Sequence, residues 1–389
     1  MPGPSAPLET EWSLLRAACS EIPAEEKTAR IRGLLPSQVR WDALLILAER
    51  HGVQPILAQS LLSFGEQVPA EALITLKQRY QANLHKALFL SSEFVRIADR
   101  LSQAGIEFIP YKGLALAETF YGDIALRQSG DIDLLIHAKD LKCIREAIGE
   151  LGYTPHEKLS ENEEEAYLKS GYECAFDGTA GRNLLEVQWA IQPHFYAVDL
   201  DVEGLFRRAQ PVRVAGSEVK SLSTEDLFLV LALHAAKHVW GRLIWLCDLA
   251  RISRLPTLNW KWIGEQAQEL GVARILRVTL LLSQKLLGSP LPSSAVENIP
   301  EDLTAKRLAG EFETYISNEK TYDVESLAYF RLMLRLRERR IDQFRFVSRF
   351  VFTPGPGEWA VMRLPKPLFP LYRVLRITRL AGRMVSGRI

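Results

Sequence analysis

Two aspartates separated by one residue are the clearest chemical signal in the chain. Asp131 and Asp133 lie in segment 131–136 (DIDLLI), whose apolar composition predicts a strand. Side chains two residues apart on a strand share a face, about 6.5 Å apart along the chain. These carboxylates repel each other unless a cation lies between them, and hard oxygen ligands suit Mg²⁺ or Mn²⁺. The alternative is a solvated strand end without a function.

The segments on either side of this pair could complete a phosphate site. Lys112 and Gly113 follow a predicted strand, 106–110, and precede a predicted helix, 114–121. Backbone N–H groups at a helix N-terminus bind phosphate, and glycine permits close approach. A third carboxylate, Glu186, lies in an apolar segment where a lone buried charge would need a partner. An exposed strand face is the alternative for Glu186.

Further candidates lie before the aspartates and on a later helix. Arg127 precedes Asp131 by four residues, so it could bind an anion above the carboxylates or neutralise them directly. His234, Lys237 and His238 are spaced i, i+3 and i+4 and share one helix face. Zinc is disfavoured there because Ala235 stands where a His-Glu-x-x-His motif needs glutamate. A solvated polar helix face is the alternative.

The surrounding pattern predicts the elements that must position these residues. Residues 1–10 are polar and proline-rich and are expected to be a disordered tail, and 11–104 have apolar residues at helical spacing. Residues 105–222 alternate short strands and helices, with hairpins 172–191 and 211–222. Residues 223–389 are mostly helical, and Ser223 is expected to cap the first helix. The order favours an α+β class, with Trp240 and Trp245 in the core and Asp248 paired with Arg242 or Arg251.

Composition narrows the compartment and the partners. The chain has 389 residues, enough for two or three domains, and a net charge of +1, which disfavours a nucleic-acid partner without excluding one. Its four cysteines are scattered and form no CxxC pair, which fits a reducing compartment. The N-terminus lacks the pattern of a signal peptide, and no apolar run reaches membrane-spanning length. A cytoplasmic location is expected.

Together these features resemble the DNA polymerase β-like nucleotidyltransferase superfamily. More closely, the chain is similar to a group of uncharacterised bacterial nucleotidyltransferase-family proteins, over roughly residues 70–260. The stretches that carry the resemblance are 111–116 (YKGLAL), 121–123 (YGD), Arg127, 130–135 (GDIDLL), 185–189 (LEVQW), 234–238 (HAAKH) and 242–250 (RLIWLCDLA).

The resemblance implies a small mixed-sheet core flanked by N-terminal and C-terminal helical regions. It also implies metal-dependent transfer of a nucleoside monophosphate from an NTP such as ATP to an acceptor hydroxyl, with release of pyrophosphate. Asp131, Asp133 and Glu186 would be the catalytic metal ligands. The nucleotide would contact Lys112, Gly113, Arg127, His234, Lys237 and His238.

Departures from the superfamily keep two rival functions open. Lys112-Gly113-Leu114 stands where the superfamily usually has Gly-Gly or Gly-Ser, and Gln188 stands where the bacterial group often has histidine. A catalytically degenerate fold that binds nucleotides or serves as an assembly module therefore remains possible. A metal-dependent glycosyltransferase also uses Asp-x-Asp, but the helical first hundred residues disfavour that fold.

The C-terminal segment has a second charge pattern. Arg373, Arg376, Arg379 and Arg383 follow helical spacing among apolar residues, and the last thirty residues contain no acidic residue. Such a basic amphipathic helix could contact a membrane surface or an acidic partner. The favoured alternative is a terminal helix packed on the body with its arginines in water. The sequence leaves the acceptor and the nucleotide base open.

Overall fold

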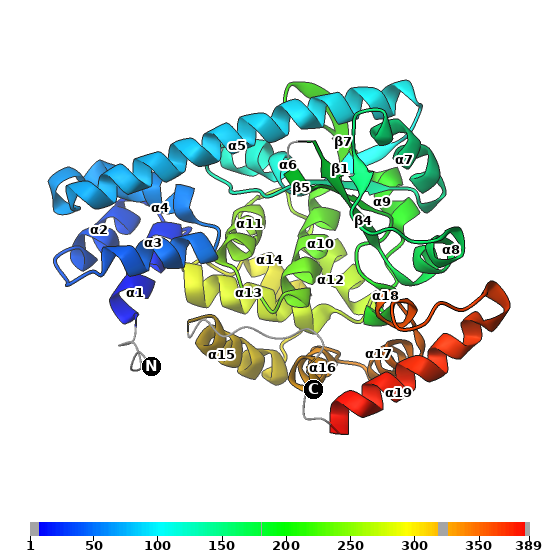
Figure 1. Cartoon of the computed structure of the whole chain (residues 1–389). Coiled ribbons are helices and arrows are strands. Elements are labelled where there is room, and N and C mark those ends of the chain that lie inside the picture. Colours follow the sequence, from blue (N-terminus) through cyan, green and yellow to red (C-terminus); the bar gives the residue numbers. More distant parts are fainter. Residues whose placement is uncertain (1–7, 180, 318–325, 386–389) are drawn as a thin grey trace.

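The computed structural model describes residues 8–179, 181–317 and 326–385. A bundle of short helices opens the chain, and one long helix, α5 (Ala70–Gln103), crosses from this bundle to the sheet (Figure 1). Its buried side chains recur at helical spacing, as the sequence predicted for the region 11–104. The preceding helices are α1 (Glu9–Cys19), α2 (Ala24–Leu34), α3 (Trp41–Arg50), α4 (Gln54–Leu61) and the 3₁₀ turn η1 (Leu62–Gln67).

A five-stranded mixed sheet forms the centre of the α+β part, and this confirms the predicted fold class. The strand order is β1-β2-β5-β4-β3; β2 and β5 run parallel, and the other neighbouring pairs run antiparallel. The parallel register places Asp133 beside Glu186. The strands are β1 (Phe108–Pro110), β2 (Ile132–Ile136), β3 (Thr154–Pro155), β4 (Glu173–Gly178) and β5 (Gly181–Gln188).

Strand periodicity divides the two faces of this sheet. Ile132 and Leu134 of β2, together with Leu185 and Val187 of β5, belong to a core shared with α5 and with α7 (Leu141–Gly149). Because side chains alternate along a strand, Asp133, Glu186 and Gln188 face the opposite side. That side faces the helices that follow the sheet.

The link to those helices contains the second predicted hairpin. β6 (Gln210–Val214) and β7 (Ser217–Ser221) are joined by Ala215 and Gly216, both with positive φ, as a two-residue hairpin turn requires. Ser223 then caps α10 (Thr224–Lys237), because its Oγ accepts a 3.2 Å hydrogen bond from the Asp226 amide. The predicted helix 114–121 is a turn of α-helix, α6 (Leu114–Leu116), followed by a π turn, η2 (Ala117–Tyr121).

Two helices in the sheet region were not predicted. α8 (Glu161–Ser170) begins with a capping box, in which the Ser160 amide donates to Glu163 Oε2 at 2.8 Å. α9 (Val202–Arg208) fills the connection between η4 (His194–Tyr196) and β6. Both helices are short and carry little apolar periodicity, so the pattern that identifies longer helices is weak in them.

Several of the remaining helices share one core with the N-terminal ones. Leu14 of α1, Leu57 of α4 and Leu282 of α13 belong to the same buried cluster. Within the described residues, no helix combines the length and apolar composition that a bilayer span needs. The helices that follow α10 are α11 (Leu243–Ser253), α12 (Trp260–Glu269), α13 (Ala273–Leu287), α14 (Ser293–Asn298), α15 (Leu303–Ser317), α16 (Leu327–Arg335), α17 (Arg340–Phe352), α18 (Pro356–Trp359) and α19 (Tyr372–Val385), and the 3₁₀ turn η5 (Lys366–Leu371) precedes α19.

Candidate functional site

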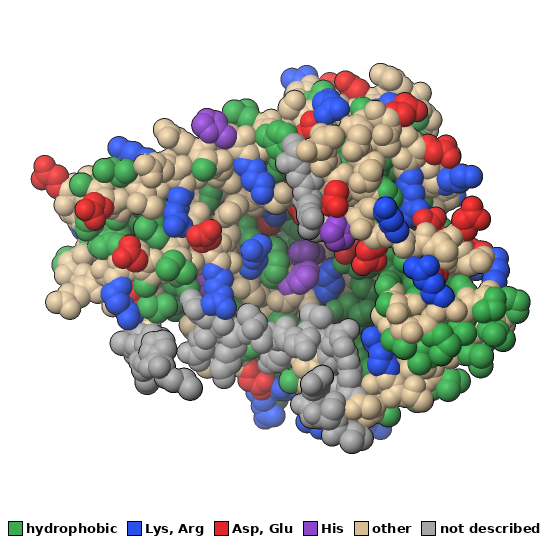
Figure 2. All heavy atoms as spheres, viewed as in Figure 1, with side chains coloured by type: hydrophobic (Ala, Val, Ile, Leu, Met, Phe, Trp, Pro, Cys, Tyr) green, Lys and Arg blue, Asp and Glu red, His purple; other side chains and the backbone are tan. Residues whose placement is uncertain are grey.

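One cavity of about 290 Å³, which we name the carboxylate cavity, lies between the polar side of the sheet and helices α10 and α11. In Figure 2, acidic, basic and histidine side chains gather around a hollow near the centre of the displayed face. All nine residues that the sequence singled out line the cavity, from segments far apart in the chain. The lining consists of Lys112, Gly113, Arg127, Gln128, Ser129, Gly130, Asp131, Asp133, Tyr172, Glu173, Glu186, Leu231, His234, Lys237, His238, Arg242, Ile244 and Trp245.

A single glutamine links three of the carboxylates in this cavity. Gln188 Nε2 lies 3.3 Å from Asp133 Oδ1, from Glu186 Oε2 and from Glu173 Oε2. The Tyr111 hydroxyl donates to Gln188 Oε1, which turns the amide N–H₂ towards the acids. Glu173 was missed by the sequence analysis, because only the register of β4, which pairs Glu173 with Gln188, brings it here.

Lys112 neutralises one of these acids. Its Nζ lies 2.6 Å from Asp133 Oδ1, and both side chains are at most 10% exposed. Burial opposes the charge of Lys112, but Asp133 and the other nearby acidic groups raise its pKa overall. The Gly113 turn that follows has φ +53°, and an added Cβ would lie 3.4 Å from the Asp131 carbonyl oxygen. The turn thus holds the lysine against β2.

The remaining acids carry excess negative charge. Burial, and then repulsion from Asp133, raise the pKa of Asp131 to about 6. Burial, followed by repulsion from Asp133 and Glu173, raises the pKa of Glu186 to about 8. Carboxylates that resist ionisation in this way would be relieved by a hard divalent cation. The chemistry of the donor set therefore fits Mg²⁺ or Mn²⁺.

The positions of these side chains place a condition on metal binding. Among the described residues, no three His, Cys, Asp or Glu side chains are gathered closely enough to hold a metal ion as they stand. Lys112 is already paired with Asp133 Oδ1, the position where a cation would draw the acids together. Metal binding by Asp131, Asp133 and Glu186 stays a prediction, and it requires these side chains to move or Lys112 to share Asp133.

Arg127 has an anionic partner within the protein. Its Nε and Nη2 donate to the two carboxylate oxygens of Asp248, each at 2.9 Å, and Tyr121 donates to the same carboxylate at 2.7 Å. A phosphate would have to compete with Asp248 for this guanidinium. The expected pairing of Asp248 with Arg242 or Arg251 was wrong, because Arg251 instead meets Glu21 at 3.1 Å.

The predicted face of α10 forms the opposite wall. His234 and His238 have ring centroids 4.8 Å apart, and each lies within 5.3 Å of the Trp245 ring. Burial and the nearby lysines lower the pKa of both histidines, so they are neutral. Trp240 is fully buried, as expected, and half-buried Trp245 packs against the core and also lines the cavity.

Lys237 and Arg242 supply positive charge to the same wall. Lys237 Nζ donates to the Tyr172 hydroxyl at 2.9 Å, and that hydroxyl donates to Glu173. Burial lowers the pKa of Lys237. Arg242 is exposed at the cavity and has no ion-pair partner within the part of the chain that the structure describes. Tyr172 carries no short sequence signal and was missed, and Arg242 was expected as a partner of Asp248 rather than as a residue of the cavity.

A second cavity of about 410 Å³ adjoins the first, because Tyr172, Lys237 and His238 line both. Its other walls are mainly aromatic and apolar, with Arg376 and Arg379 from α19. Its remaining lining residues are Tyr167, Ser170, Gly171, Pro193, Phe195, Tyr196, Phe350, Thr353, Pro354, Gly355, Pro356, Gly357, Glu358 and Leu380.

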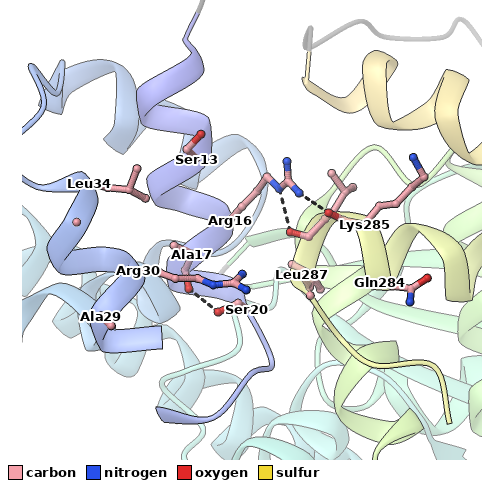
Figure 3. A pocket seen from close by; sticks show the side chains of 13 residues that line it. Ser13, Arg16, Ala17, Ser20, Ala29, Arg30, Leu34, Gln284, Lys285 and Leu287 are labelled. Carbon is pink, nitrogen blue, oxygen red and sulfur yellow. Dashed lines mark hydrogen bonds between the residues drawn. The ribbon is translucent and has the colours of Figure 1, made fainter. Parts of the chain in front are cut away.

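A third cavity, of about 630 Å³, lies away from the acids, between α1, α2 and the end of α13 (Figure 3). Arg16 extends across it and donates to the Leu286 carbonyl at 3.0 Å. Its charged lining residues, Arg16, Arg30 and Lys285, are all basic. This cavity therefore lacks the paired carboxylates that metal chemistry needs.

Comparison with known proteins agrees with the geometry. No curated protein and no solved structure matches the chain. A family model described as "Uncharacterised nucleotidyltransferase" matches residues 37–288, which is more than half of the chain and includes every residue of the carboxylate cavity. The chain therefore belongs to this family of uncharacterised nucleotidyltransferases.

Proposed function

We propose that the protein is a DNA polymerase β-like, Mg²⁺- or Mn²⁺-dependent enzyme that transfers a nucleoside monophosphate from an NTP such as ATP to an acceptor hydroxyl. Pyrophosphate is the second product. One observation carries the proposal: four carboxylates beside the Gly113 turn line one cavity, and the pKa values of two of them are raised. A cytoplasmic setting in a bacterium, where NTP and Mg²⁺ are abundant, belongs to the same proposal.

In this proposal the acids divide into ligands and a base. Asp131, Asp133 and Glu186 would hold the metal, which when bound neutralises charge on the phosphates and on the reacting oxygens. Alternatively, Glu186 would not bind the metal and would instead accept the proton of the acceptor hydroxyl, because its raised pKa makes the carboxylate a stronger base. Gln188 fixes the positions of the Asp133 and Glu186 carboxylates relative to each other, because its N–H₂ group donates to both.

The other residues would bind the nucleotide. The positively charged groups of Lys112, Lys237 and Arg242 lie around the cavity and can neutralise a triphosphate. Trp245 and the neutral rings of His234 and His238 offer an aromatic surface for a base. Gly113 permits close approach of a phosphate to the backbone, and Arg127 contributes only if Asp248 releases it.

The adjoining 410 Å³ cavity is the proposed acceptor site. It shares Tyr172, Lys237 and His238 with the first cavity, and Tyr172 contacts the acid Glu173, so a hydroxyl placed there would lie beside the acids. Its size lies within the range of small-molecule sites, about 300–1,000 Å³. Aromatic and proline walls favour an acceptor with a flat or apolar body.

The test measures NTP binding and turnover together. Titration calorimetry with each NTP and Mg²⁺ or Mn²⁺ should show metal-dependent binding, and label from α-³²P NTP should appear in an acceptor from cell extract. Asp131→Asn, Asp133→Asn and Glu186→Gln should abolish labelling, whereas Glu146→Gln, on exposed α7 surface, should keep it. Labelling that survives the three site variants would disprove these roles.

A degenerate binding or assembly module is the second candidate, and the Lys112–Asp133 contact favours it because the internal cation satisfies one predicted ligand. This candidate gives NTP binding without labelled product. A metal-dependent glycosyltransferase would instead bind sugar nucleotides in preference to free NTP, and the same calorimetry distinguishes it.

A further inference from the structure

The segment that leads into the last helix exposes a dense group of apolar side chains. Of the fifteen large hydrophobic side chains that are exposed in the described part of the chain, six fall within residues 361–377, and they are between 40% and 61% exposed. Figure 2 shows hydrophobic side chains gathered where α18 connects to α19 in Figure 1. We name this group the C-terminal apolar patch; its members are Val361, Met362, Leu368, Leu371, Val374 and Ile377.

The patch is interleaved with positive charge. Arg363, Lys366 and Arg373 are exposed among its members. Between residues 343 and 385 the only acidic residue is Glu358, and it is fully buried. Its carboxylate holds Arg376 at 3.3 Å and Arg379 at 2.8 Å, on the inner side of α19. Lys366 also contacts Glu165 of α8, in an exposed pair that water and salt screen.

Internal hydrogen bonds hold the patch in place. Tyr372 is buried, and its hydroxyl donates to the Met362 carbonyl and accepts from the Leu364 amide, each at 2.9 Å. Arg376 Nε donates to the Phe350 carbonyl at 2.7 Å, which fastens α19 to α17. The apolar side chains are therefore presented outward by a packed platform.

We propose that the C-terminal apolar patch docks the protein on an anionic lipid bilayer. Apolar side chains would enter the boundary between headgroups and acyl chains while Arg363, Lys366 and Arg373 meet lipid phosphates, a combination typical of interfacial segments. A second copy of the chain fits less well, because a two-fold contact would bring the same arginines together. An acidic protein would satisfy the charges but would not require six outward apolar side chains.

Vesicle flotation of the full-length protein tests the proposal. Phosphatidylcholine–phosphatidylglycerol vesicles should carry the protein upward, with binding about tenfold weaker to phosphatidylcholine alone and weaker at high salt. The apolar variant Val361→Asp/Val374→Asp and the charge variant Arg363→Glu/Arg373→Glu should each lose binding about tenfold or more. Leu303→Asp is the matched control, because Leu303 is 71% exposed on α15.

Three results would overturn the proposal. The first is absence of binding to either kind of vesicle. The second is equal loss of binding in Leu303→Asp and the patch variants at unchanged melting temperature. The third is a wild-type dimer in solution that Val361→Asp/Val374→Asp converts to monomer, which would identify the patch as an interface between copies. If the apolar variant unfolds, the exposed charge variant still decides between the outcomes.

Discussion

Lys112 and the acids around it form an incompletely neutralised cluster. The lysine contacts Asp133 at 2.6 Å, while the pKa values of Asp131 and Glu186 remain raised. Lys112 therefore does not neutralise the acids fully, and the site can take up more positive charge. This imbalance separates a cation-binding site from an ordinary buried ion pair, in which both partners are satisfied.

Replacement of Lys112 tests this balance. In the absence of divalent metal, Lys112→Met should lower the free energy of unfolding by about 3 kcal/mol, because Asp133 is left buried beside other acids. Mg²⁺ should restore much of that loss if it occupies the same position. Urea unfolding with and without Mg²⁺ measures both effects.

Lys139→Met, at an exposed position, is the control and should change stability by less than about 0.5 kcal/mol. A loss in Lys112→Met that Mg²⁺ leaves unchanged would contradict a cation site at these carboxylates. No loss at all would mean that the pair with Asp133 contributes nothing to folding.

Glu186 should make stability depend on pH. Its pKa is about 8 in the folded chain against an ordinary value of 4.5, so the folded state binds the proton more tightly than the unfolded state. Stability should therefore fall as pH rises through this interval. In metal-free buffer, Glu186→Gln should melt about 2 °C above wild type near pH 9 and close to wild type near pH 4.

Scanning calorimetry of both proteins between pH 4 and pH 9 measures whether the melting temperature of the wild type falls relative to that of Glu186→Gln as pH rises. Glu146→Gln should track the wild type at every pH, because Glu146 is exposed on α7. If Glu186→Gln differs from the wild type by the same amount at all pH values, Glu186 does not titrate in this interval.

At this scale, the type and spacing of residues located the carboxylate cavity but not its full lining. Asp131, Asp133 and Glu186 were identifiable because a charge pattern interrupts apolar strands. Glu173 was not, because its position depends on the pairing of β4 with β5. Arg127 was visible as a cation, but its partner Asp248 lies 121 residues further along, in helix α11.

At the scale of elements, the turn between β1 and α6 sets the geometry of the site. Gly113 has φ +53°, a conformation that L-residues with a side chain rarely adopt, and its Cα faces the Asp131 carbonyl. The turn therefore fixes the distance between the predicted phosphate-binding backbone and β2.

Two glycines allow a matched test of this turn. Gly122→Ala should lower the free energy of unfolding by about 1 kcal/mol, because Gly122 is in the left-handed helical region, and Gly113→Ala by about 2 kcal/mol or more, because its φ of +53° and ψ of −119° suit glycine alone. Only Gly113→Ala should also weaken NTP binding by calorimetry, since nothing lies within 4 Å of a Cβ at Gly122. Equal NTP binding by the two variants would show that the Gly113 turn does not contact the nucleotide.

Secondary structure was predictable where periodicity or turn chemistry was strong. The 34 residues of α5 and the two-residue turn at Ala215 and Gly216 each carry such a signal. α8 was missed because its apolar face is short, although Ser160 and Glu163 have the spacing of a capping box. The parallel pairing of β2 with β5 could not be predicted from local sequence pattern either, because 44 residues separate Ile136 from Gly181.

Across the whole molecule, the N-terminal helices share one interior with helices that follow the sheet. α1 and α4 bury leucines in the cluster that contains α10, α11 and α13, while the sheet has its own cluster with α5 and α7. Amphipathic spacing predicted that these helices bury a face. It could not predict which helices would pack together, because the apolar face of one helix can pack against the apolar face of many others.

The shared interior predicts that the N-terminal helices and the helices of the site unfold together. Leu15 of α1 is fully buried in this cluster, so Leu15→Ala should lower the free energy of unfolding by about 3 kcal/mol. The shift should appear equally in tryptophan fluorescence and in loss of far-UV ellipticity, and NTP binding should disappear in the same transition. Ile46→Ala, at a 62% exposed position on α3, should leave the transition unchanged. Two separate transitions, of which Leu15→Ala shifts only one, would mean that the terminal helices fold independently of the site.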